Sequence, residues 1–292
     1  MNFPKSFPTK YRRHLASNIA RLMLAGMGLL FGGLFFAGLF LGGQGAAALD
    51  DDGHKATPIT TCGTAISQPG RYYLANDLKQ CPGMGVSITV SYVEVELRGH
   101  TIQGTFGDNG IVANGGDAGI SSIEIEGPGT VTGFLTGVVF ENVHRSRTHN
   151  VVALRNKFGM AVNAGDFTNA ATVAATVSTD NEIRDNVFTG NTGHGITVNG
   201  GNENRFIHNN LSNNGGHGLF LFAAANNVAR HNTALVNGGS GIDLGKFGPG
   251  NLINDNIALG NNGFDLNDEN GDCTHNTWTD NSFLSNNPGC VQ

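Results

Sequence analysis

The sequence predicts an all-β solenoid, a parallel β-helix of about eight coils that follows an amino-terminal signal or anchor helix. Three observations lead to this fold class. Short segments that begin with Gly and continue with alternating apolar residues recur eight times. An Asn-x4-Asn-x4-Asn pattern recurs at the same pitch through the last five units, and no amphipathic helical period is present. The 44 Gly among 292 residues are therefore ordered by position, which excludes a loosely folded chain.

One strand in each coil is expected to start at a glycine. The segments are GVSITV at Gly85, GIVA at Gly110, GVVF at Gly137, GMAV at Gly159, GITV at Gly195, GLFL at Gly218, GIDL at Gly241 and GFDL at Gly263. Their spacings are 25, 27, 22, 36, 23, 23 and 22 residues. The single long spacing predicts an insertion of about 13 residues between Asp166 and Asp180.

Asparagine is expected to line three columns of turns. The columns are Asn181, Asn204, Asn227, Asn251 and Asn276; Asn186, Asn209, Asn232, Asn256 and Asn281; and Asn191, Asn214, Asn237, Asn261 and Asn286. Apolar residues such as Ile183, Phe188, Ile196 and Val198 lie between them and predict three short strands per coil with these side chains inward. Stacked Asn side chains can pair their amides, and Asn tolerates left-handed backbone, so this pattern has a purely structural reason.

The first 48 residues read as a secretory signal. A basic stretch ends at Arg21, a 20-residue apolar run covers Leu22 to Leu41, and Ala46-x-Ala48 offers a cleavage site. The run is also long enough to be an uncleaved membrane anchor, and Arg12-Arg13 partly resembles a twin-arginine export motif. We expect a signal or anchor over residues 1–48, a linker over 49–59 and the β-helix over 60–292. The protein is expected to be periplasmic, cell-surface or secreted, with membrane contact only through an uncleaved segment.

The charge of the chain argues against nucleic-acid binding, and its cysteines indicate an exported protein with disulfides. Residues 1–48 carry five basic residues and no acid, which leaves 12 basic and 23 acidic residues, a net charge of −11, on the rest. So acidic a body is a poor partner for nucleic acid. All four cysteines follow residue 48, which indicates two disulfides in an exported chain; four cysteines allow three pairings.

Two stretches resemble a known family, the right-handed parallel β-helix repeat proteins of the pectate-lyase-like superfamily. They are Leu97–Gly104 (LRGHTIQG) and the closing segment from Phe264 to Asn270 with Cys273, Asn276, Trp278 and Cys290, which is similar to uncharacterised bacterial exported members. The resemblance covers residues 60–292 and implies the fold but no single activity. In such a rod the two cysteine clusters lie at opposite ends, so the expected pairs are Cys62 with Cys81 and Cys273 with Cys290.

The outer face of the glycine-led strand is where family members that cleave polyuronates act. If Ile196 and Val198 point inward, the outward residues include Phe220 and Phe222, whose rings could stack on sugars; the alternative is an apolar patch covered by a neighbouring loop or a partner chain. Asn163 and Asn199 lie on the same strip. These four are the candidate substrate-binding residues.

Acidic residues on the last two coils suggest a cation site. Asp243 and Asp265 are one repeat apart, and Asp268 follows closely, so their oxygens could hold calcium, with a solvated acidic cap as the alternative. No motif requires a cofactor, and calcium is the ion expected at these aspartates. Histidines recur in two stacked positions, Gly-His-Gly at His194 and His217, and a row of Asp185, His208, His231, Asp255 and Asp280. Both are interpreted as turn residues, with a transition-metal site as the alternative for the second row.

A basic cluster after the third strand is the candidate catalytic site. It contains Glu141, His144, Arg145 and Arg147 and precedes the predicted insertion. Elimination from a uronate needs a base and a positive charge near the carboxylate, and this cluster offers both; a solvated turn is the alternative.

The leading hypothesis is an exported, monomeric β-helix protein that binds, and cleaves or epimerises, an acidic, uronate-containing polysaccharide along its strand face. A lyase, an epimerase and a glycoside hydrolase are all compatible with the sequence. The alternative is a non-catalytic structural or adhesive module of the cell envelope.

Overall fold

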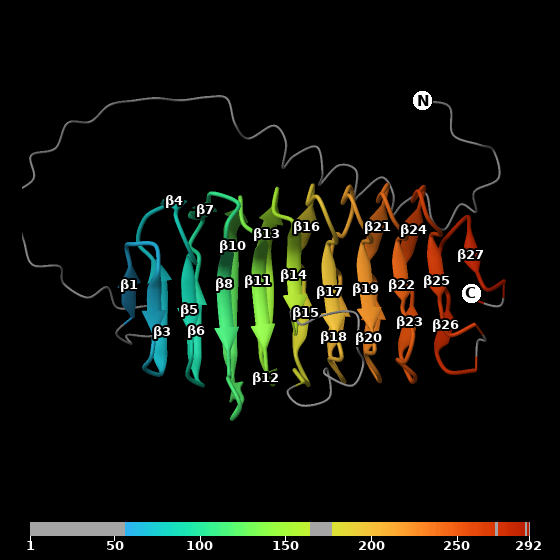
Figure 1. Ribbon diagram of the computed structural model, residues 1–292, viewed down its shortest axis with the longest axis horizontal. Helices are drawn as coiled ribbons and strands as arrows, with labels where there is room; N and C mark the ends of the chain where they lie inside the picture. Colours follow the sequence, from blue (N-terminus) through green and yellow to red (C-terminus); the bar gives the residue numbers. More distant parts are fainter. Residues whose placement is uncertain (1–55, 164–176, 272–273, 290, 292) are drawn as a thin grey trace, which may run out of the picture. The chain divides into compact units, whose positions relative to one another are not determined.

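The computed structural model describes residues 56–163, 177–271, 274–289 and 291, which form a right-handed parallel β-helix (Figure 1). Every pairing between named strands is parallel, and about nine coils stack on one another. No α-helix occurs among the described residues, and within them no segment could cross a membrane as a helix. The predicted fold class is confirmed.

The glycine-led strands form one ten-stranded sheet, called sheet 1 here. In order, its strands are β2 (Thr64–Ile66), β5 (Val86–Ile88), β8 (Asn109–Asn114), β11 (Thr136–Glu141), β14 (Phe158–Val162), β17 (Ile196–Asn199), β19 (Leu219–Phe222), β22 (Ile242–Leu244), β25 (Leu266–Asp268) and β27 (Asn286–Asn287). The eight expected segments correspond to β5 through β25. The coil count is higher than expected because β2 and β27 extend the sheet at its two ends.

Apart from two separate two-stranded sheets, the remaining strands belong to a thirteen-stranded sheet, called sheet 2 here. Its main path is β1 (Thr57–Ile59), β3 (Gly70–Leu74), β6 (Val93–Glu96), β10 (Ile123–Thr132), β13 (Arg147–Leu154), β15 (Glu182–Arg184), β18 (Arg205–Ile207), β20 (Val228–Arg230), β23 (Leu252–Asn254) and β26 (Thr277–Thr279). A third row is formed by β4 (Leu78–Cys81), β7 (Thr101–Gly104), the second halves of β10 and β13, β16 (Val187–Thr189), β21 (Thr233–Leu235) and β24 (Ile257–Leu259). A short pair, β9 (Ile120–Ser121) with β12 (Val143–His144), lies between sheets 1 and 2 in the chain.

The expected domain bounds and disulfides are only partly covered by the described residues. The signal or anchor at residues 1–48 and most of the insertion lie outside the described residues. β1 precedes residue 60, so the first coil begins inside the segment expected to be a linker. The Cys62–Cys81 disulfide is confirmed. The expected partners Cys273 and Cys290 lie outside the described residues.

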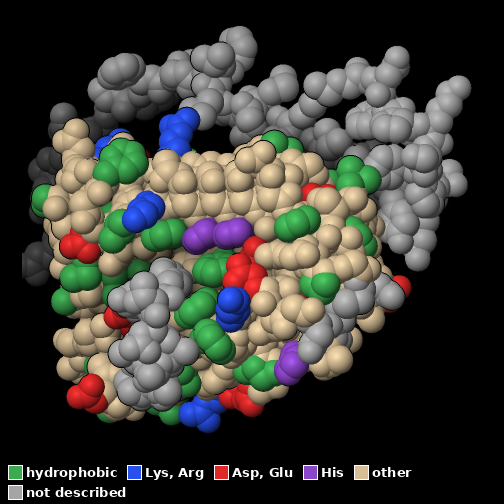
Figure 2. Space-filling view, turned by 45° about the vertical axis from the view of Figure 1, so that its right-hand side comes forward, with side chains coloured by type: hydrophobic (Ala, Val, Ile, Leu, Met, Phe, Trp, Pro, Cys, Tyr) green, Lys and Arg blue, Asp and Glu red, His purple; other side chains and the backbone are tan. Residues whose placement is uncertain are grey.

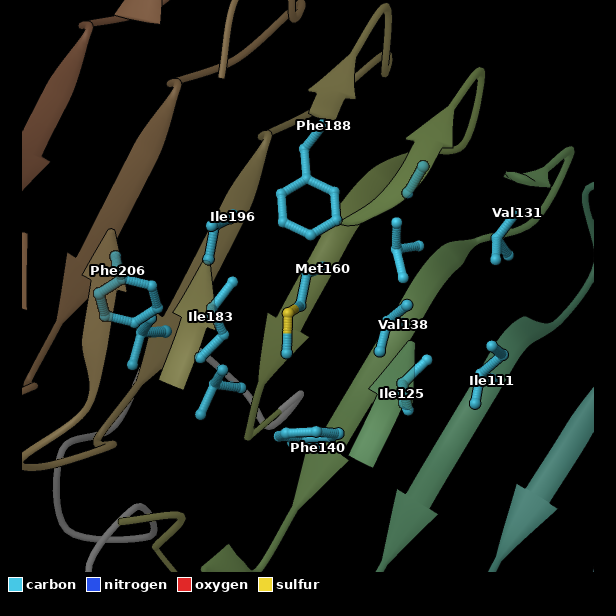
Figure 3. Packing of buried hydrophobic residues seen from close by; sticks show 14 of the residues in the cluster. Ile111, Ile125, Val131, Val138, Phe140, Met160, Ile183, Phe188, Ile196 and Phe206 are labelled. Atoms are coloured by element: carbon cyan, nitrogen blue, oxygen red, sulfur yellow. The ribbon is translucent and has the colours of Figure 1, made fainter. Parts of the chain in front are cut away.

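The interior is filled by the apolar residues that alternate along each strand, as Figure 3 shows. Ile183, Phe188, Ile196 and Val198, predicted to point inward, are all fully buried. The largest fully buried side chains are Phe134, Phe140, Phe188 and Phe206. Because strands alternate their faces, the neighbours of these residues point out of the helix.

The glycine column exists because the coils approach too closely for a side chain. A Cβ on any of seven column glycines would lie within 2.6 Å of a backbone oxygen of the next coil: Gly85, Gly110, Gly137, Gly159, Gly195, Gly218 and Gly241. The eighth position is not Gly263, as the sequence pattern predicts, but Asp265, whose oxygen faces Gly241. The repeat is therefore shifted by two residues in the last complete coil.

The Asn columns form continuous amide ladders inside the turns. Asn209 is typical: its Oδ1 accepts from the backbone N and Nδ2 of Asn186, and its Nδ2 donates to Asn232 Oδ1 and to the Ile183 carbonyl. Two columns run as predicted to Asn276 and Asn281. The third begins one coil earlier, at Asn156, and does not reach Asn286.

The third ladder ends on a carboxylate. Asn261 donates its backbone N–H and its Nδ2 to Asp265 Oδ1, at 3.1 and 2.8 Å. Asp265 Oδ2 accepts from the backbone N of Leu284 and Ser285. Asp265 thus stands where the other coils have the column glycine, and its carboxylate also accepts the hydrogen bonds that the next Asn of the third ladder would accept. This explains why the sequence pattern shifts there.

Candidate functional site

A row of rings crosses the outer side of sheet 1 and is called the aromatic strip here. It contains Phe158, His194, His217, Phe220, Phe222 and Phe247. Ring centroids are 5.5 Å apart for Phe158 and His194, and 4.9 Å for His194 and His217. Phe220 lies 5.2 Å from His217 and 6.3 Å from Phe222. Figure 2 shows two histidine side chains side by side on this face, with hydrophobic, acidic and basic side chains next to them.

Strand register places the rings on successive coils. Thr197, Phe220, Asp243 and Asn267 are paired neighbours in β17, β19, β22 and β25, and Asn199 pairs with Phe222. Phe220 and Phe222 point outward as predicted, but both are only half exposed because they pack on each other and on neighbouring side chains. Phe222 also meets Phe247 edge-on at 6.4 Å.

Both strip histidines are locked in one tautomer by backbone donors. His194 Nδ1 accepts the backbone N–H of His217 at 2.9 Å, and His217 Nδ1 accepts that of Ser240 at 2.8 Å. A nitrogen that accepts an N–H carries no proton, so each neutral ring carries its hydrogen on Nε2. His217 Nδ1 also lies 3.5 Å from Asp243 Oδ2, but the Ser240 hydrogen bond argues against an ion pair there.

Protonation of His194 should destabilise the fold. Burial first, and then the neighbouring His217, lower the pKa of His194 from 6.5 to about 4. The unfolded chain takes up this proton near pH 6.5, whereas the folded chain does so only near pH 4. The titration of His194 therefore costs no stability above pH 6.5. As the pH drops from 6.5 toward 4, it lowers the free energy of unfolding by at most about 3 kcal/mol.

Denaturant unfolding at pH 7 and pH 4 checks this. The wild type should lose about 3 kcal/mol more between the two pH values than His194→Asn, which has no group titrating in that range. An equal loss in the two proteins would contradict the buried, neutral state of His194.

Two carboxyl groups lie at one side of the strip. Asp243 is 2 % exposed, and its Oδ2 accepts from Asn267 Nδ2 at 2.9 Å. Burial raises the pKa of Glu269, as does the negative charge of Asp243, while Lys246 and His217 act in the opposite direction. Asp243, Glu269, Lys246 and His217 are thus close enough to interact electrostatically.

The other two expected binding residues are not exposed on the strip as the sequence predicts. Asn163 Oδ1 accepts from the backbone N and the hydroxyl of Ser178, and its Nδ2 donates to the Asn199 carbonyl at 3.1 Å. Asn199 lies in sheet 1 beside Phe222 but is 1 % exposed. The structure therefore places only the Phe pair at the accessible surface of the strip.

The three aspartates proposed for calcium do not come together. Asp243 pairs with Asn267 rather than with Asp265. Asp265 closes the third ladder, and Asp268 points inward, where its Oδ2 accepts from Asn276 Nδ2 and from the Trp278 indole. The strand period separates Asp243 from Asp268, since one faces out and the other in. Among the described residues, no group of three His, Cys, Asp or Glu side chains has a metal-binding arrangement.

The predicted catalytic cluster is divided by the corner between the two sheets. Glu141 ends β11 and accepts from Asn114 Nδ2 at 2.7 Å. Arg147 starts β13 in sheet 2 and lies 3.5 Å from Glu124. Glu141 and Arg147 thus lie on opposite sides of a turn, in different sheets, and a catalytic role for the cluster stays a prediction.

His144 and Arg145 occupy the corner itself. His144 contacts the Asn142 amide and the Thr179 hydroxyl at 3.1 and 3.0 Å. Burial and the charge of Arg145 lower the pKa of His144, and Asp180 opposes them. Arg145 and Arg147 line a hollow of about 520 Å³ together with acidic residues of sheet 2, among them Glu124.

The second histidine row is a turn ladder, as interpreted from the sequence. Its five members share left-handed backbone with φ between 55° and 57°: Asp185, His208, His231, Asp255 and Asp280. The rings of His208 and His231 stack at 4.9 Å. Even spacing along the helix axis explains why they do not converge on one point.

The sequence did not assign four of the six rings to the strip: Phe158, His194, His217 and Phe247. Aligning the residue before each column glycine would have revealed the first three, and Lys157 lies 5.2 Å above the Phe158 ring. Glu269 follows β25 directly, in a turn.

Comparison with known proteins supports the fold. Residues 162–292 match the family model described as right handed beta helix region. A search of curated proteins gave no match. Among solved structures, the periplasmic alginate epimerase AlgG is similar with a TM-score of 0.52 and 13 % identity over 82 % of this chain and 64 % of that chain. A double mutant of the same enzyme gives 0.51 and 14 % over 75 % of this chain and 51 % of that chain.

Pectate lyase Pel9A is a further similar structure, with a TM-score of 0.45 and 13 % identity over 82 % of this chain and 70 % of that chain. The chain spans about half to two thirds of the AlgG structures that it matches. At these identities the likeness concerns the fold alone. The stacked coils and the ladders make the described part of this chain a right-handed parallel β-helix, and its second half matches the family model of that description.

Proposed function

We propose that this protein binds an acidic, uronate-containing polysaccharide along the outer face of sheet 1, with sugar rings stacked on the aromatic strip. The observation that carries the proposal is the continuous series of rings from Phe158 to Phe247 across neighbouring coils. Phe158, His194, His217 and Phe220 stack on one another, so the row presents ring edges, and the Phe247 ring at its end, as apolar contact area for successive sugars. Phe247 is 66 % exposed, so part of the strip is open.

Lys157 supports the choice of an acidic chain. Its ammonium lies above the Phe158 ring at the end of the strip, and it is exposed. No ion pair joins it to another described residue, so its charge is available to a sugar carboxylate. The carboxylates of Asp243 and Glu269 lie toward the other end, where an uncharged sugar face fits better.

Removal of a strip ring should weaken binding. Phe220→Ala deletes a ring that contacts both histidines, and we expect about a five- to tenfold loss of affinity. Affinity electrophoresis through gels with pectate, alginate or a neutral glycan measures it. Tyr92→Ala is the matched control, because Tyr92 is 68 % exposed but lies before β6, in sheet 2.

Three outcomes of this experiment are informative. Retardation of the wild type in an acidic gel and its loss in Phe220→Ala but not Tyr92→Ala would support the site. Lys157→Ala should weaken binding to the acidic glycans more than to the neutral one. Unretarded migration in every gel would contradict polysaccharide binding and favour the alternative of a non-catalytic structural module, for which the Asn ladders suffice.

Chemistry on the bound chain is the second part of the proposal. Cleavage or epimerisation requires a proton donor or acceptor at the strip, and Glu269 and His217 are the groups that the structure places there. The absorbance of an unsaturated product tests elimination, and released reducing ends test hydrolysis. Activity that persists in Glu269→Gln and in His217→Gln would exclude these roles.

We further propose that the protein is exported. The Cys62–Cys81 disulfide is typical of oxidising compartments and not of the cytosol. Fractionation of cells that produce the full chain, with mass analysis of its amino terminus, tests both export and cleavage after Ala48.

A further inference from the structure

Three buried acceptor atoms beside the strip have no hydrogen-bond partner. They are Thr197 Oγ1, Asn199 Oδ1 and Asp243 Oδ1. Each residue is at most 2 % exposed. A buried polar atom without a partner costs roughly 1–3 kcal/mol, so its retention needs an explanation.

The three atoms lie on one face, around two phenylalanines. Thr197 and Asn199 are the register neighbours of Phe220 and Phe222 in β17, and Asp243 is the neighbour of Phe220 on the opposite side, in β22. All five side chains project from the outer face of sheet 1. The acceptors therefore form a single floor interrupted by the Phe pair.

The Phe rings lean over the β22 side of this floor. A Cβ added at Gly245, two residues beyond Asp243, would lie 3.2 Å from Phe220 Cε2 and 3.1 Å from Phe222 Cδ2. Both rings thus rest on the backbone of Gly245, where a larger residue would displace them. Phenylalanine has no donor of its own, so the rings cover Asp243 without satisfying it.

We propose that Thr197, Asn199 and Asp243 form a subsite for the hydroxyl groups of a sugar ring, which enters when Phe220 and Phe222 turn aside. A sugar supplies O–H donors in the number and spacing that three neighbouring acceptors require. The displaced rings then form the wall on which the sugar face stacks. The inference rests on the proposed polysaccharide function and names the groups that recognise the sugar.

The subsite predicts opposite effects on stability and binding. Thr197→Val and Asn199→Leu replace an unpartnered polar group with an apolar one of similar volume, so both should raise the midpoint of thermal unfolding. Each also removes one hydrogen bond to the sugar, so affinity for the retarding glycan should fall about fivefold. A purely structural role would not move the two quantities in opposite directions.

A matched control is Thr189→Val. Thr189 lies in β16, and its hydroxyl donates to the Ser212 carbonyl at 2.6 Å. It should lower stability and leave binding unchanged. Thermal unfolding and affinity electrophoresis of the full chain measure both quantities for all variants.

The outcomes separate this subsite from the binding function. If the wild type binds but Thr197→Val and Asn199→Leu bind equally well, the subsite is wrong and the function stands. A loss of stability in both variants would show that the atoms are partnered and would also overturn the subsite. If the wild type binds no glycan, the proposed function fails and the subsite with it.

Discussion

Asn209→Ala should unfold most of the protein, because it interrupts an amide ladder in the middle of the helix. Asn209 is 1 % exposed, and its side chain takes part in four hydrogen bonds. Alanine would remove the acceptor of the Asn186 backbone N–H and of one N–H of its amide, whose other N–H still donates to the Thr148 carbonyl, and it would remove the side-chain donor to the Ile183 carbonyl. At roughly 1–3 kcal/mol for each such group, the expected cost is on the order of 4–6 kcal/mol, comparable with the whole stability of many domains.

The measurement is the free energy of unfolding from denaturant titration, together with soluble yield. Asn262→Ala is the control, since Asn262 is exposed and its side chain has no hydrogen bond to another described residue. It should change stability by less than about 0.5 kcal/mol. A loss below about 2 kcal/mol in Asn209→Ala would mean that water or relaxation satisfies the ladder.

Gly195→Ala should be nearly as damaging, for a steric reason. The added Cβ would lie 2.6 Å from the Gly218 oxygen and 2.9 Å from Asn214 Nδ2. Relief requires adjacent coils to separate, although their spacing is set by the hydrogen bonds between parallel strands. We expect a loss of about 3 kcal/mol, at the upper end for overpacking.

Gly107→Ala is the matched control for this prediction. No atom lies within 4 Å of a Cβ at Gly107, and its backbone is not left-handed. The substitution should be neutral or stabilise by up to about 1 kcal/mol, because alanine restricts the unfolded chain. Denaturant unfolding of both variants decides the matter, and equal effects would contradict a specific steric role for the glycine column.

The repeat positions explain why the architecture could be predicted so completely. A glycine is required wherever coils touch, and an asparagine wherever a turn needs two donors and a shared acceptor. These demands recur at every coil, so they leave a periodic pattern that a single sequence reveals. The inward residues Ile183 and Phe188 followed from the same period.

The predicted register was wrong in the last complete coil, where one residue occupies two of the repeated positions. Asp265 occupies the column glycine position and also ends the third ladder. Alignment on Gly263 hid this, shifted β25 by two residues and placed Asp265 beside Asp243. The expected calcium site rested on that register.

The candidate site was only partly predictable for a related reason. Phe220 and Phe222 were found because they break the polar pattern of the outer face. His194 was read as a turn residue because its neighbours are glycines, and only the ring stacking shows that it belongs to the strip. The cluster from Glu141 to Arg147 was close in sequence but divided by a corner.

The regular spacing of Gly and Asn in the sequence is enough to predict a parallel β-helix with glycine contacts and amide ladders. Those features follow from local requirements that repeat in every coil. The contacts between side chains of different coils are known from the structure alone: the aromatic strip, the pairing of Asp243 with Asn267, and the unpartnered acceptors beside the Phe pair. The physical reason is that stacking brings together residues some 23 positions apart, and a two-residue shift in one coil changes every such contact without altering the repeat itself.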